Sequence, residues 1–197
     1  VFYEEALGIT KRVFGSDSIE VSAALICVAR TMKSLLQFEA AANYYDAAAQ
    51  IKEAVLGPIT SDVALLYDQV GSMYVKLKWY EEGVNVYGQS YSIRKQLYGE
   101  SHAELALSLE LLSALHEEWN HPSEAASRLE EALEIRIAHH GGRGSTDIAD
   151  ILVKLAALAR KNRKPRNALP YLNEALATYR SCYGSKHAVV ASTLCSI

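Results

Sequence analysis

The sequence of 197 residues predicts an all-α superhelix (an α-α solenoid) of about ten antiparallel helices. Short segments ending in glycine recur at a nearly constant interval, and large and small residues recur in register within that interval. The composition also favours helices, because Ala, Leu and Glu are frequent and no alternating run rich in Val and Ile predicts a strand. With 50% hydrophobic and 22% charged residues, the chain is typical of well-packed proteins.

Five glycines define the interval. They are Gly15, Gly57, Gly99, Gly141 and Gly184. Their spacings are 42, 42, 42 and 43 residues, and the extra residue falls in the stretch GGRGS at 141–145. Self-similarity at a period of about 20–50 residues indicates stacked units that bury a continuous core together.

Each interval contains two helical patterns. In the first, apolar residues three and four positions apart share one helix face. Its large column reads Leu25, Tyr67, Leu109 and Leu152, and its small column reads Ala29, Gly71, Ser113 and Ala156. In the second, the small column reads Ala41, Gly83, Ala125 and Ala168, and the large column reads Tyr45, Tyr87, Leu129 and Leu172. Small residues let two helices cross closely, so each interval predicts a packed helix pair.

Capping and turn residues predict the helix boundaries. Pro122 and Pro165 share one register at the expected first position of a second helix, where proline is well tolerated. Gly57, with a proline directly after it, is a helix-stop signal. Ser101 with Glu104 forms a capping-box pattern at the start of a first helix.

The intervals predict one solenoid domain over residues 1–197. Complete repeats are expected at 16–57, 58–99, 100–141 and 142–184, with half repeats at 1–15 and 185–197. The first half repeat is a second helix without its partner, and the last is a first helix without its partner. We therefore expect the sequence to be cut from a longer solenoid.

This pattern resembles the tetratricopeptide repeat in its 42-residue, kinesin-light-chain-like form. The segments YGESHAELALSL (98–109) and YGSKHAVVASTL (183–194) resemble the junctions of that family, and VYGQSYSIRKQLYG (86–99) resembles its second helix. The resemblance implies protein or peptide partners and an inner, concave face made by the first helices. At the family's peptide-reading Asn position the chain has Cys27, Gln69, Leu111 and Lys154.

The resemblance also implies which side chains lie on the concave face. The candidate partner-binding residues are Arg30, Lys33, Asp68, Gln69, Ser72, Lys76, Glu110, Glu117, Glu118, Lys154, Arg160 and Lys161. Apolar residues such as Leu65 and Leu107 lie among them. A partner is expected to place a basic segment against the three glutamates. The alternative interpretation is a polar face that is only solvated.

Other chemistry is not predicted. No P-loop, GxSxG, HExxH or GxGxxG motif occurs, so we expect neither an enzyme nor a cofactor. Three cysteines lack CxxC spacing, and His116, His121, His139 and His140 share one repeat without the dense Cys/His spacing of metal ligands, so no metal site is predicted. His102 and His187 are expected to form hydrogen bonds at helix starts. A net charge of −3 argues against nucleic acid, and the absence of an apolar run of about 18 residues argues against membrane insertion.

Two functions of different kinds remain open at this point. The first is an interaction scaffold or adaptor that binds a partner peptide or helix in the concave groove. The second is a structural solenoid segment of a large cytoskeletal or ciliary assembly, or the regulatory arm of a larger multidomain protein. Both predict a cytoplasmic protein that forms part of a larger chain and complex.

Overall fold

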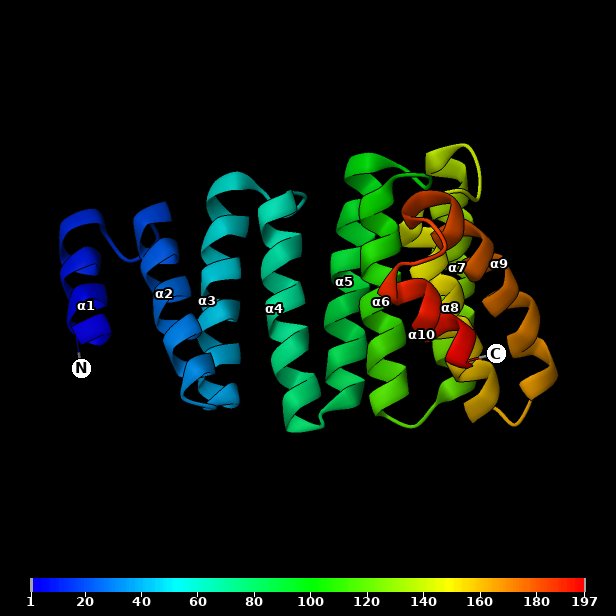
Figure 1. Ribbon diagram of the computed structural model, residues 1–197. Coiled ribbons are helices and arrows are strands. Elements are labelled where there is room, and N and C mark those ends of the chain that lie inside the picture. Colours follow the sequence, from blue (N-terminus) through cyan, green and yellow to red (C-terminus); the bar gives the residue numbers. More distant parts are fainter. Residues whose placement is uncertain (1, 197) are drawn as a thin grey trace. The chain divides into compact units, whose positions relative to one another are not determined.

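The computed structural model describes residues 2–196, and this part of the chain is all-α (Figure 1). Its helices are α1 (Phe2–Phe14), α2 (Ile19–Ser34), α3 (Phe38–Leu56), α4 (Ser61–Leu77), α5 (Tyr80–Tyr98), α6 (Ala103–Glu118), α7 (Pro122–His140), α8 (Thr146–Lys161), α9 (Pro165–Tyr183) and α10 (Ala188–Ser196). The prediction of about ten helices is confirmed. We call the even-numbered helices A helices and the odd-numbered helices B helices, since each repeat begins with an A helix.

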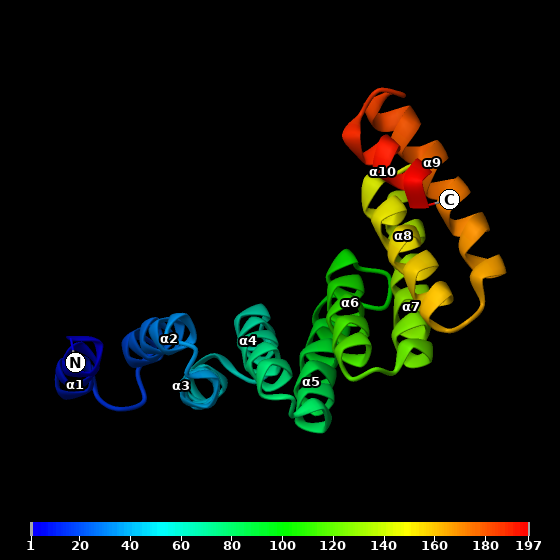
Figure 2. The ribbon, with the colours of Figure 1, turned by 60° about the horizontal axis from the view of Figure 1, so that its bottom comes forward.

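The helices form two compact units, residues 1–99 and residues 100–197. In the first unit, each helix from α1 to α5 packs against its neighbour in the sequence. In the second unit, α6 to α10 do the same. Figure 2 looks nearly along the axes of α1, α2 and α3 and shows α2 and α3 as direct neighbours.

Every turn from an A helix to its B helix uses one backbone conformation. The turn residues with positive φ, between 57° and 63°, are Leu36, Lys78, Asn120 and Arg163. In all four turns, the next residue donates its backbone N–H to the carbonyl oxygen five positions back, at 2.7–2.9 Å. This is the bond of a Schellman motif, and it holds a left-handed residue that is not glycine. These A–B turns therefore have the same shape although their sequences differ.

The turns from B helices to A helices instead depend on glycine. Positive φ values of 67–93° occur at the glycines Gly15, Gly57, Gly99, Gly141 and Gly184. Gly57, Gly99 and Gly184 combine this φ with ψ of 159–178°, a conformation that strains any residue with a side chain, so the spacing of glycine marks where B helices end.

The start of α6 corrects one prediction. The helix begins at Ala103, and its cap is His102, whose Nδ1 accepts a hydrogen bond from the backbone N–H of Glu104 at 3.2 Å. The capping box at Ser101 was therefore placed one residue too early, because an imidazole does here what a hydroxyl does in α2, α4 and α8. His187 accepts a similar bond before α10 at 3.3 Å. The expectation that both histidines bond at helix starts is confirmed.

The predicted small columns form the contact between A and B helices. Ala29, Ser113 and Ala156 are at most 2% exposed, and the large residues opposite them are also buried. The contact at Gly71 is especially tight, since an added Cβ there would lie 2.6 Å from Cε1 of Tyr87. Glycine at this position makes room for a buried tyrosine ring.

Gly71→Ala is expected to lower the free energy of unfolding by about 1 kcal/mol. Overpacking costs about 1–3 kcal/mol, and the gain in helix propensity returns about 1 kcal/mol. Adding Tyr87→Leu should restore stability, since Ala156 and Leu172 form this pair in the last repeat. Urea denaturation followed by circular dichroism measures both variants, and a stabilising Gly71→Ala alone would contradict the packing argument.

Candidate functional site

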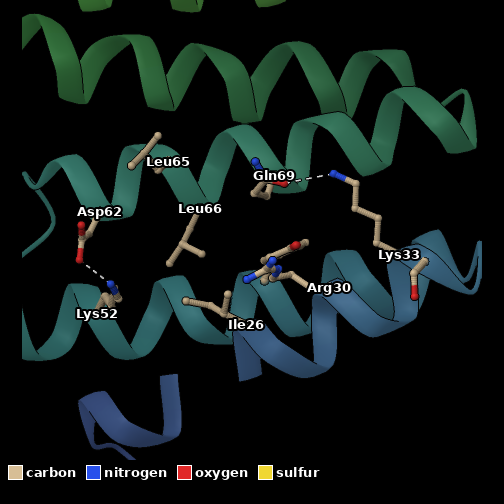
Figure 3. A pocket seen from close by; sticks show the side chains of 10 residues that line it. Ile26, Arg30, Lys33, Lys52, Asp62, Leu65, Leu66 and Gln69 are labelled. Atoms are coloured by element: carbon tan, nitrogen blue, oxygen red, sulfur yellow. Dashed lines mark hydrogen bonds and ion pairs between the residues drawn. The ribbon is translucent and has the colours of Figure 1, made fainter. Parts of the chain in front are cut away.

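A groove opens on residues 16–99 between α2, α3 and α4, with a volume of about 740 Å³ (Figure 3). We call it the N-terminal groove. Its lining residues are Ile26, Arg30, Lys33, Ser34, Tyr45, Lys52, Asp62, Leu65, Leu66 and Gln69. Three of the predicted partner-binding residues, Arg30, Lys33 and Gln69, thus line one hollow.

The middle of the groove is apolar. Ile26 of α2 and Leu65 and Leu66 of α4 line it, and Leu65 is 53% exposed. Leu66 points toward the ribbons of α2 and α3 in Figure 3 and is buried. An apolar partner side chain placed here would cover Leu65, and such burial contributes about 25 cal/mol for each Å² removed from water.

One end of the groove is positively charged. Arg30 has no hydrogen bond or ion pair to any residue between 2 and 196. Burial raises the pKa of the Tyr45 phenol, and the nearby charge of Arg30 opposes that rise. Lys33 Nζ donates to Oε1 of Gln69 at 3.3 Å, which links α2 to α4 (Figure 3).

The opposite end of the groove is electrically neutral, because Lys52 of α3 forms an ion pair with Asp62 of α4 (Figure 3). Arg30 and Lys33 are therefore the uncompensated charges of the groove. The surface offered to a ligand is an apolar centre beside two cations one helical turn apart.

Lys52 also belongs to a column of hydrogen-bond donors that the sequence analysis missed. The equivalent residues of the four B helices α3, α5, α7 and α9 are Lys52, Arg94, Arg136 and Tyr179. Each of them donates to a carboxylate on an A helix. The donor column has a sequence signal. Three cations and a phenol occupy one position of the repeat, and acidic residues lie on the neighbouring A helices.

Arg94 is a buried member of this donor column, with 3% of its side chain exposed. Its Nη2 lies 2.6 Å from Oδ2 of Asp68, and its Nη1 lies 3.2 Å from Oδ1. Ser90 donates to the same Oδ1 at 2.6 Å. Asp68, a predicted partner-binding residue, is thus engaged in holding α5 against α4.

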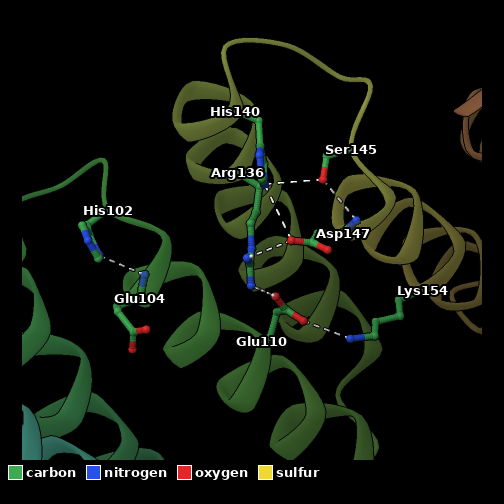
Figure 4. A network of polar contacts seen from close by, with 8 residues as sticks. All are labelled: His102, Glu104, Glu110, Arg136, His140, Ser145, Asp147 and Lys154. Carbon is green, nitrogen blue, oxygen red and sulfur yellow. Dashed lines mark hydrogen bonds and ion pairs between the residues drawn. The ribbon is translucent and has the colours of Figure 1, made fainter. Parts of the chain in front are cut away.

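In the second unit, Arg136 of α7 lies between two A helices (Figure 4). Its Nη2 is 3.1 Å from Oε1 of Glu110 in α6, and its Nη1 is 3.4 Å from Oδ2 of Asp147 in α8. Lys154 of α8 binds the other oxygen of Glu110 at 3.0 Å. These residues line a hollow of about 420 Å³ whose charges largely neutralise one another.

Tyr179 completes the donor column by bonding to Asp150. Burial and this hydrogen bond raise the pKa of the Tyr179 phenol, so it remains a neutral donor.

The remaining predicted residues have different surroundings. Glu117 forms an ion pair with Lys161, so two of the three acidic residues expected to meet a basic partner already bind lysines of α8. Ser72 donates to the backbone carbonyl of Gln69 at 2.9 Å. Three others, Lys76, Glu118 and Arg160, are exposed and have no ion pair within the described chain.

The histidines of the repeat 100–141 are used in ring contacts. Trp119 lies 4.5 Å from His121 and 6.2 Å from His116, measured between ring centroids. Burial lowers the pKa of His116.

In residues 2–196, no group of three or more His, Cys, Asp or Glu side chains is placed to hold a metal ion. None of the helices described is both long and apolar enough to cross a membrane.

Residues 62–138, from α4 into α7, match the family model of the tetratricopeptide repeat. This part of the chain is thus identified as tetratricopeptide repeats. Its fold is similar to the crystal structure of BtubC (BKLC) from P. vanneervenii, with a TM-score of 0.77, 20% identity, and coverage of 94% of this chain and 73% of that one. No curated protein sequence matches the chain significantly.

Two further structures have the same fold. The kinesin light chain TPR-like repeats of Podosopora anserina have a TM-score of 0.78 and 16% identity, over 92% of this chain and 85% of that one. RapI has a TM-score of 0.71 and 19% identity, over 91% of this chain and 62% of that one. The chain therefore shares the all-α superhelical fold of kinesin-light-chain-like tetratricopeptide repeats.

Proposed function

We propose that this chain is a non-catalytic adaptor that holds an extended partner segment in the N-terminal groove. The observation that supports this most directly is the exposed Leu65 beside the unpaired guanidinium of Arg30, within one hollow of about 740 Å³. Pockets that bind ligands commonly combine an apolar surface with a few polar groups that fix orientation.

The groove has a distinct site for each part of such a segment. An apolar side chain would cover Leu65 and Ile26, and a neighbouring carboxylate would meet Arg30. Gln69 accepts from Lys33 through its Oε1 and makes no other side-chain bond within residues 2–196. Its amide N–H groups can therefore donate to a backbone carbonyl of the partner.

The basic partner segment expected from the sequence has weaker support. To reach Glu110 or Glu117, it would have to displace Lys154 or Lys161 from ion pairs that the chain already forms. Of the three acidic residues, only Glu118 is exposed without an ion pair among the residues described.

Leu65→Glu is expected to abolish most partner binding by placing a charge on the apolar centre of the groove. The probe is a display library of random short peptides selected on the whole chain, with the recovered peptides measured by fluorescence polarisation. Recovered sequences should combine an apolar residue with nearby Asp or Glu. Their affinity should fall at least about tenfold in Leu65→Glu, because a buried unpaired charge is costly.

Leu107→Glu is the matched control, because Leu107 is the equivalent residue of the next repeat and is 42% exposed. It should change affinity by less than about twofold, since surface substitutions away from a contact have small effects. Equal losses in the two variants, or a lysine-rich set of recovered peptides, would refute binding in the N-terminal groove.

The second candidate function is a structural segment of a larger assembly, cytoskeletal or ciliary in the form that the sequence predicts. It is favoured by the ion pairs Glu110–Lys154 and Glu117–Lys161, which join α6 to α8. These four candidate partner-binding residues bind each other within the chain. Under this alternative, the peptide selection would recover no sequence whose binding depends on Leu65.

A further inference from the structure

We propose that the turn between α8 and α9 binds an acidic polypeptide segment. This turn, residues 160–166, reads RKNRKPR and carries five of the 20 Lys and Arg residues of the chain. Its cations are Arg160, Lys161, Arg163, Lys164 and Arg166. We call it the basic turn. It lies within the second unit and is independent of the N-terminal groove.

The fold does not use most of this charge. Lys161 pairs with Glu117 of α6. The other four cations are exposed and form no ion pair or side-chain hydrogen bond within residues 2–196. They are held close together on a turn fixed at both sides, because α8 ends at Lys161 and α9 begins at Pro165. Four unpaired like charges in seven residues leave a local positive potential that an anionic partner would relieve.

The start of α9 makes the local charge still less favourable. The other B helices of complete repeats carry acidic residues in their first turn, namely Glu39 in α3, Glu81 and Glu82 in α5, and Glu124 in α7. The first turn of α9 has none and contains Arg166, with Lys164 directly before it. Cations at a helix start oppose the helix dipole, so these residues weaken the local fold.

A hollow of about 210 Å³ adjoins the basic turn. Lys164 lines it, together with the amides of Asn162 and Asn167. Asn162 is held rigidly, since its Nδ2 donates to the carbonyl of Pro122 at 3.0 Å and its Oδ1 accepts from Ser123 at 3.2 Å. A bound chain could place carboxylates on the turn and its backbone against the polar wall of the hollow.

The chemistry of the turn favours a polypeptide over the other polyanions. Residues 160–168 contain no aromatic or large apolar residue, and Tyr171 of the adjoining hollow is half-buried and donates to Glu130, so the site offers little surface for stacking on bases or for insertion into a lipid surface. The one paired cation, Lys161, binds a carboxylate. The chain has a net charge of −3, which does not favour a general attraction to nucleic acid.

The test uses the whole chain and a fluorescein-labelled peptide of alternating glutamate and glycine. The variant Arg163→Glu with Arg166→Glu should weaken peptide binding at least about tenfold, because it reverses two exposed charges. The matched control is Lys11→Glu with Lys78→Glu, which changes the net charge equally at two exposed positions of the first unit; Lys78 is the residue equivalent to Arg163. Binding to the control should change by less than about twofold, because rim charges outside a contact contribute little.

A peptide of the opposite charge distinguishes a loss of recognition from a variant that does not fold. Arg163→Glu with Arg166→Glu should bind a peptide of alternating lysine and glycine that the unmodified chain does not bind, a gain that an unfolded variant would not show. Affinity for the glutamate peptide should fall as salt rises. Equal losses in the two paired variants, no binding of the glutamate peptide at low salt, or tighter binding of oligouridylate or phosphatidylserine vesicles would each overturn the proposal.

Discussion

Replacing Arg94 with alanine is expected to lower the free energy of unfolding by about 3–5 kcal/mol, the usual cost of removing one partner from a buried ion pair. The guanidinium is 3% exposed, and Asp68 beside it is 11% exposed. Without Arg94, the Asp68 carboxylate keeps only the hydroxyl of Ser90 among the partners described above. The loss is therefore dominated by an uncompensated buried charge and not by the contact itself.

Lys52→Ala is the control for this prediction, since Lys52 occupies the equivalent position in α3. Its partner Asp62 is 49% exposed, so water can solvate the carboxylate that remains. We expect a loss of at most about 1 kcal/mol, as for exposed ion pairs. Urea denaturation of both variants gives the comparison, and similar losses would show that burial does not decide the strength of the donor column. Adding Asp68→Ala to Arg94→Ala should recover part of the loss.

Replacing Pro170 with alanine is expected to raise the free energy of unfolding by about 2 kcal/mol. Pro170 is exposed and lies inside α9, where it cannot donate a backbone hydrogen bond to the preceding turn. Proline in a helix interior costs about 3 kcal/mol relative to alanine, and its restriction of the unfolded chain returns about 1 kcal/mol.

Pro165→Ala tests the same residue type in the same helix at a position where proline fits. Pro165 is the first residue of α9, and its missing N–H would have no partner within the helix. Its replacement should leave stability unchanged or lower it by up to about 1 kcal/mol through the more flexible unfolded chain. If both proline variants behave alike in thermal melts, position in the helix does not determine the effect.

The helices could be predicted because repetition makes each signal visible several times. The spacing of Gly57, Gly99 and Gly184 marks helix ends, since only glycine combines their positive φ with an extended ψ without strain. The start of α6 was misplaced because His102 caps it with a ring nitrogen, and capping boxes are recognised by hydroxyls and carboxylates.

The candidate site was only partly predictable. Arg30, Lys33 and Gln69 were expected on the inner face and line one groove. The pairing of charges follows the register only when the acidic columns are compared as well. Arg94–Asp68 and Arg136–Glu110 are equivalent pairs. The equivalent position in the repeat of Lys52 is Ile26, so Lys52 binds Asp62 of the next A helix instead.

The left-handed residue of the A–B turns has a consequence for how this chain can change over evolution. Its conformation is held by backbone hydrogen bonds of the turn, and its side chain points into solvent in all four repeats. The position accommodates Leu36, Lys78, Asn120 and Arg163 with the same φ. The chain can therefore acquire a new surface chemistry at one turn by single substitutions, while the packing of every helix pair is inherited unchanged.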